Sequence, residues 1–138
     1  MKKGLIFVVL VAMVFVLTGC GNKPSTLTCT MKVSSVNVEL TANFAGKKVT
    51  AMGMKYDMDV SNYSDSTIET ISKQDYCSTV QKSMPTFTLT DCKQNVENKH
   101  VIVTSGIDLD KMDKSQLVGS PEETKKALEA QGYTCTLK

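Results

Sequence analysis

The chain contains no arginine and no tryptophan, and it has a single histidine, His100, among its 138 residues. Arginine supplies the planar fork that binds phosphate through two hydrogen bonds, so its absence, with no dense lysine run to replace it, argues against a nucleic-acid partner. One histidine without a CxxC motif argues against zinc. Because no nucleophile elbow, phosphate-binding loop or catalytic histidine pair is present, we predict no enzyme and no cofactor.

The N-terminus carries two lysines, an unbroken apolar run from Leu5 to Leu17, and then Thr18-Gly19-Cys20. The run is shorter than the ~20 residues that a helix needs to span a bilayer. An ordinary secretory signal ends in a small-x-small site, whereas here Leu17 stands three residues before the cut. Residues 1–20 therefore resemble the signal peptide of bacterial lipoproteins. The resemblance implies cleavage between Gly19 and Cys20 and a diacylglycerol thioether on the Cys20 sulfur, with acyl chains such as palmitate.

This resemblance fixes the expected location of the protein. Two or more acyl chains hold a protein on a bilayer almost permanently. We therefore expect residues 1–19 to be removed, Cys20 to attach the chain to the lipid bilayer at the extracytoplasmic face of the cell membrane, and residues 20–26 to contain that cysteine and a short linker. Residues 27–138 are enough for one domain with a core and too few for two.

The remainder of the sequence predicts an α+β domain. Apolar and polar residues alternate over 27–44 and 49–60, and again over 86–93 and 99–107, which predicts two β-hairpins. The alternation slips by one residue at Ser34-Ser35, which indicates a β-bulge or a break into two strands. Helical spacing over 66–83, ended by Pro85, predicts a first helix; Ser120-Pro121 begins a second helix and Gly132 ends it. A last strand follows, which gives an antiparallel sheet in the order ββαββαβ.

Four cysteines follow the lipid-attachment residue, and an even number in an exported domain predicts two disulfide bonds. Of the three possible pairings we favour Cys29–Cys135 with Cys77–Cys92. Cys29 and Cys135 each lie on the apolar face of a terminal strand, so a bridge between neighbouring strands would join the two ends of the domain. Cys77 would lie on the first helix and Cys92 on the next strand. Cys92 has the opposite parity from the apolar residues of its strand, which requires a bulge near Asp91 or a helix over that face.

Several segments together are similar to one family. The lipoprotein signal, Phe44-Ala-Gly-Lys-Lys-Val-Thr50, Asp108-Leu-Asp-Lys-Met112 and the closing Gln131-Gly-Tyr133 resemble the YehR-like bacterial lipoproteins, a family built on a domain of unknown function. The resemblance covers nearly all of the mature chain. It implies an anchored extracytoplasmic α+β domain without family-wide catalytic residues.

Two further patterns could bind a metal ion. Met52, Met54 and Met58 share one face of a strand, and thioethers suit Cu(I), although methionines at alternate positions are also ordinary core residues. Asp108, Asp110 and Asp113 resemble the start of a calcium loop but lack its glycine and distal glutamate, which favours a solvated turn.

Three hypotheses follow. The leading one is a non-enzymatic envelope lipoprotein that binds a protein or cell-wall partner near the membrane. The alternatives are a soft-metal or small-ligand binder that uses the methionine face, and a thiol-active envelope protein.

Overall fold

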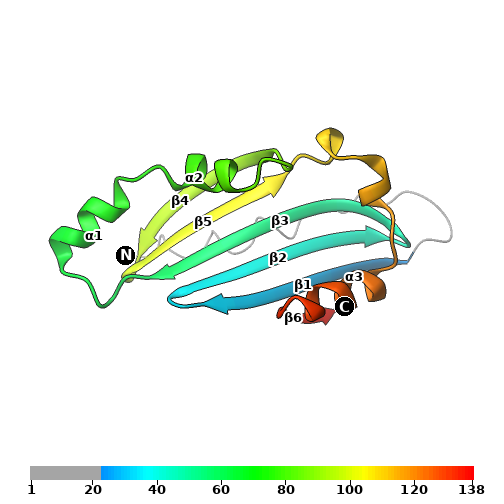
Figure 1. Cartoon of the computed structure of the whole chain (residues 1–138), viewed down its shortest axis with the longest axis horizontal. Coiled ribbons are helices and arrows are strands. Elements are labelled where there is room, and N and C mark those ends of the chain that lie inside the picture. The colour runs from blue at the N-terminus through cyan, green and yellow to red at the C-terminus, as the bar shows by residue number, and fades with distance from the viewer. Residues whose placement is uncertain (1–22) are drawn as a thin grey trace.

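A computed structural model describes residues 23–138, which form one antiparallel sheet with α2 and α3 on the same face (Figure 1). The strand order is β4-β5-β3-β2-β1-β6. The strands are β1 (Pro24–Val33), β2 (Val36–Ala45), β3 (Lys48–Asp59), β4 (Leu89–Glu97), β5 (His100–Ile107) and β6 (Thr134–Leu137). The helices are α1 (Asp65–Ser72), α2 (Tyr76–Ser83) and α3 (Pro121–Ala130), with the short 3-10 helices η1 (Leu109–Lys111) and η2 (Lys114–Leu117). The expected α+β class with an antiparallel sheet is confirmed.

The expected order ββαββαβ is wrong in its first hairpin, which contains three strands. The slip at Ser34-Ser35 is a break, because Val33 pairs with Val36 and the chain reverses between them. Ser34 adopts a φ of 54°, the left-handed backbone that two-residue hairpin turns require. The parity slip in the sequence therefore marked a turn, and β1, β2 and β3 form a meander.

The single helix expected over 66–83 is also wrong, since α1 ends at Ser72 and α2 begins at Tyr76. Asp75 caps α2 by accepting a hydrogen bond from the Ser78 amide. The Gln94 side chain of β4 fills the break: its amide donates to the Gln74 carbonyl at 2.8 Å and its oxygen accepts from the Tyr76 N–H at 3.0 Å. Backbone groups freed by the break are thus satisfied from a strand that follows later in the chain.

The second hairpin begins later than expected, at Leu89 instead of Thr86, and its turn is shorter. β4 continues to Glu97, so only Asn98 and Lys99 form the turn, both with positive φ as in a type I′ hairpin. Of the two alternatives considered for Cys92, the bulge near Asp91 is present. The β4–β5 register shifts between Thr90 and Lys93, and Asp91 has a φ of 51°.

The C-terminal helix follows the sequence closely. The Ser120 side chain caps α3 by accepting a hydrogen bond from the Glu123 amide, and Pro121 occupies the first turn. Gly132, just after the helix, has a φ of 99°. At the other terminus the expected linker is too long. Pro24 already pairs with Ala45 in the sheet, and Thr26 exchanges two backbone hydrogen bonds with Lys138. Residues 24–26 therefore belong to β1.

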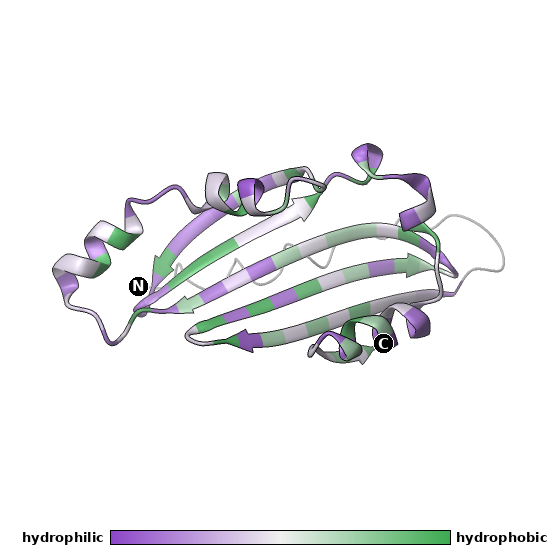
Figure 2. Ribbon diagram, in the orientation of Figure 1, coloured by the Kyte–Doolittle hydropathy of each residue, from purple (hydrophilic) through white to green (hydrophobic). Residues whose placement is uncertain are grey.

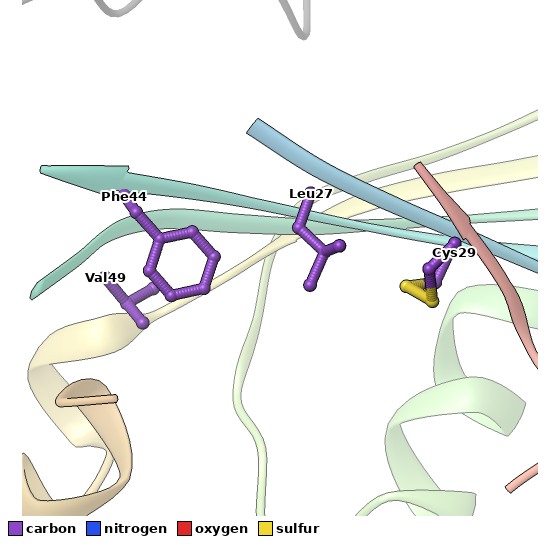
Figure 3. Packing of buried hydrophobic residues seen from close by; sticks show 5 residues of the cluster. Leu27, Cys29, Phe44 and Val49 are labelled. Atoms are coloured by element: carbon purple, nitrogen blue, oxygen red, sulfur yellow. A yellow bond between two sulfur atoms is a disulfide. The ribbon is translucent and has the colours of Figure 1, made fainter. Parts of the chain in front are cut away.

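The main core lies between the sheet and a layer made of α3, η1 and η2. Its buried members are Leu27, Cys29, Phe44, Val49 and Cys135, several of which are drawn in Figure 3. Apolar and polar segments alternate along the long strands in Figure 2, as expected for a sheet with one face packed and one wet. Within residues 23–138, no helix combines the length and the apolar character needed to cross a bilayer.

Candidate binding surface

The packed face of the sheet consists of successive cross-strand rows, because partners in an antiparallel sheet point to the same side. One row joins Cys135, Cys29, Leu40, Met54 and Ser105. The next two rows lie nearer the β1–β2 turn. Their members from β1, β2 and β3, together with Leu40, form what we call the open face: Met31, Val33, Val36, Val38, Leu40, Tyr56 and Met58.

The open face is apolar, yet none of its side chains is fully buried. Val33 is 53% exposed and the other members are partly exposed, whereas Leu27 and Cys29 on the same face are 1% and 0% exposed. The difference follows from the helices. α3 lies over β1 and β6, and α2 lies beside β4, so the middle of the sheet remains uncovered in Figure 1.

A cleft adjoins the open face toward the β2–β3 turn. It has a volume of about 230 Å³, and its apolar lining includes Phe44, Val49, Met52, Phe87, Met112 and Val118. Ala42 and Met52 form a cross-strand pair in this lining, one row before Leu40 and Met54. The lining contains no ionisable side chain. The cleft and the open face together make a continuous apolar strip along β2 and β3.

Tyr56 is the one member of the open face with a hydroxyl group. Its pKa is raised above the ordinary value of 10.0, first by burial and then by the neighbouring Tyr133. The phenol is therefore neutral and can donate a hydrogen bond at physiological pH. Met31 approaches the chain that leaves α3, since a Cβ on Gly132 would lie 3.9 Å from its sulfur.

The three methionines of the soft-metal hypothesis lie on one face of β3 but do not converge. Met52 lines the cleft and Met54 is 6% exposed, with Met58 two rows further on. A strand rises ~3.3 Å per residue, so Met52 and Met58 are roughly 20 Å apart along it. Across residues 23–138, no three His, Cys, Asp or Glu side chains gather as a metal site would require.

The four cysteines of the domain are joined as Cys29–Cys135 and Cys77–Cys92, the pairing favoured from the sequence. Cys29 and Cys135 are cross-strand partners of β1 and β6, and both are buried. Cys77 and Cys92 join α2 to β4 and are partly exposed. The first bridge therefore ties β6, the strand that follows α3, to β1, and the second ties α2 to β4. The helices α3 and α2 border the open face.

One pair of side chains had no role in the sequence interpretation. His100 Nδ1 lies 2.6 Å from Asp57 Oδ1 on the polar face, where Asp59 is the strand partner of His100. The pKa of Asp59 is lowered by hydrogen bonds from Ser61 and, to a smaller extent, by His100 and Lys32. The period of two along β3 and β5 could have indicated this pair if the register had been known. It lies on the opposite side of the sheet from the cleft.

The aspartates of the calcium-like motif act as helix caps. Asp108 accepts from the Asp110 amide at the start of η1, and Asp113 accepts from the Ser115 amide at the start of η2. The hydrogen bonds from Ser115 lower the pKa of Asp113. The interpretation as an ordinary turn agrees with these contacts. Gly19 and Cys20, the expected cleavage and lipid-attachment residues, lie outside the described residues.

Comparison with known proteins identifies a shared fold. No family model and no curated protein matches this chain. The domain is similar to a solved NMR structure of a protein from Streptococcus pneumoniae TIGR4, with a TM-score of 0.52 and 13% sequence identity, over 91% of this chain and 92% of that one. At this identity the similarity concerns the fold alone.

Proposed function

We propose that this protein is a lipid-anchored extracytoplasmic lipoprotein of the YehR-like kind whose domain binds an envelope protein through the open face. The observation that supports binding is the open face on β1, β2 and β3, whose apolar side chains all stay partly or largely exposed within residues 23–138. Monomeric soluble proteins seldom leave a contiguous apolar area of this kind unless it is used for interaction. A segment with alternating or helical apolar side chains fits such a surface.

Binding agrees with the surface better than catalysis does. The cleft has no ionisable side chain in its lining, and the His100–Asp57 pair lies on the other face of the sheet. General acid–base or nucleophilic chemistry needs such groups within hydrogen-bond reach of the substrate. We therefore assign the protein no catalytic step.

The two alternative functions have less support. Spacing along β3 separates Met52 from Met58, so a soft metal ion would have at most two of the three thioethers. A thiol-active protein would use Cys77–Cys92, since Cys29–Cys135 is buried. Thiol titration of the native protein separates this case, because structural bridges leave no free thiol.

The anchor is tested on the intact protein. Wild-type protein should have the mass of a chain that begins at Cys20 with added lipid, and Cys20→Ala should accumulate as an unprocessed precursor. A mature wild-type chain without added lipid would overturn the anchored location.

The binding surface is tested by photo-crosslinking in intact cells. A benzophenone side chain replaces Val38, on the open face, or Thr41, on the same strand but the opposite face. Adducts with an envelope protein, identified by mass spectrometry, are expected from position 38 and not from position 41. Equal adduct yields from the two positions would exclude the open face as the specific surface.

A further inference from the structure

The end of the domain nearest to Cys20 carries a cluster of lysines and an exposed apolar side chain. The Gly46 amide donates to the Lys23 carbonyl at 3.2 Å, so the β2–β3 turn lies beside the start of β1. Gly119 donates to the Lys47 carbonyl at 2.9 Å, and Val118 forms an isolated bridge with Lys48. We call this group the lysine end: Lys23, Lys47, Lys48 and Val118.

The lysine end is exposed, and Val118 is 66% exposed although it is apolar. No salt bridge is seen for its three lysines among residues 23–138. The nearest acidic residues along the chain, Glu122 and Glu123, lie in the first turn of α3. There the positive end of the helix dipole already compensates their charge.

The distance to the membrane follows from the covalent chain. Lys23 is the third residue after Cys20, and an extended chain spans at most ~3.6 Å per residue, so Lys23 lies within roughly 10 Å of a lipidated cysteine. Screening at physiological salt has a length of about 8 Å. The ammonium groups of the lysine end are thus close enough to sense anionic headgroups.

We propose that the lysine end docks on anionic phospholipid headgroups, with Val118 inserted between them, and so orients the anchored domain. This inference rests on the proposed lipid anchor. The opposite end of the sheet, which carries the β1–β2 turn and the open face, then points away from the bilayer and is accessible to a partner. Each lysine near an anionic surface favours docking about fivefold.

The test uses the mature lipidated protein in nanodiscs of phosphatidylcholine alone or with phosphatidylglycerol. A membrane-impermeant amine reagent labels the lysines, and mass spectrometry gives the rate at each position. Labelling of Lys23, Lys47 and Lys48 should slow severalfold in the anionic nanodiscs and recover at high salt. Lys32 and Lys99, at the far end of the sheet, should label equally in both.

A matched pair of variants isolates the surface. Lys47→Gln/Lys48→Gln should abolish the protection of Lys23, whereas Lys32→Gln/Lys99→Gln, with the same loss of charge, should retain it. Equal labelling in both lipid compositions would overturn the docking while leaving the anchor in place. Intact mass measured on the same sample tells the two failures apart, because protein without lipid overturns both.

Discussion

The two halves of the apolar sheet face are built from similar side chains and differ in what covers them. In the covered half, Leu27 and Cys29 are almost completely buried under α3. In the open half, Val33 on β1 and Val36 and Val38 on β2 point to the same face of the sheet and remain partly or largely exposed. Burial here depends on a helix and strand from the end of the chain, which the Cys29–Cys135 bridge joins to β1 across a separation of 106 residues. The covered half therefore stabilises the fold, and the open half leaves apolar side chains in contact with solvent.

Removal of the buried Cys29–Cys135 bridge, which holds the covered half together, should have the largest effect on stability. In the chain-entropy model a loop of about 100 residues contributes ~4.7 kcal/mol and a 15-residue loop ~3 kcal/mol. Cys29→Ser/Cys135→Ser should therefore lower the thermal unfolding midpoint more than Cys77→Ser/Cys92→Ser, whose loop spans 15 residues. Calorimetry measures both midpoints, and Cys29→Ala/Cys135→Ala controls for buried hydroxyl groups. A larger loss from the shorter bridge would contradict the view that the C-terminal elements hold the covered half together.

Truncation of one side chain in each half should give the next largest difference. Leu27→Ala removes a side chain that is 1% exposed and should cost about 2–5 kcal/mol of unfolding free energy. Val36→Ala, in the partly exposed open face, should cost about 1 kcal/mol or less. Urea denaturation at constant slope measures both values. If the two losses were equal, the open face would be as important to the core as the covered half.

The elements specified by local chemistry could be predicted from the sequence, and those specified by distant contacts could not. Ser120, Pro121 and Gly132 define α3 through capping and backbone conformation, and the sequence placed them correctly. The break between α1 and α2 depends on Gln94, a residue on a later strand, so no local pattern marked it.

The candidate surface was predictable only in part for the same reason. Parity placed Met52, Met54 and Met58 on one face, and the structure agrees. The packing of α3 and α2 decides which of these residues are covered. The alternation of apolar and polar residues along β3 does not predict that packing. The open face became visible only when the register of neighbouring strands was known.

A smaller effect is expected from the break between α1 and α2, since α2 borders the open half. Gln94→Ala removes the hydrogen bonds to the Gln74 carbonyl and the Tyr76 amide and should cost about 1 kcal/mol. Amides of residues 73–76 should also exchange faster with solvent. Asn95→Ala, the next residue on β4, is the control and should change neither quantity. Unchanged exchange in Gln94→Ala would mean that the caps of α1 and α2 alone fix the break.

The smallest expected effect concerns Tyr56, which is a partly buried member of the open face. Its pKa in the folded protein is above 10.0, whereas an unfolded tyrosine titrates near ~10. Below that pH both states keep the proton, and stability does not depend on this group. Above it the unfolded state loses the proton first, so this contribution to stability falls as pH rises from about 10 through the folded pKa. Tyr56→Phe should therefore lose less stability than wild type between pH 9 and pH 11. The measurement is the urea midpoint of unfolding, taken at intervals of about half a pH unit. Tyr63→Phe is the control, since that side chain is 52% exposed, and it should follow the wild-type curve. Parallel curves for wild type and Tyr56→Phe would mean that the phenol is solvated as freely as in the unfolded chain, which would contradict its partial burial in the open face.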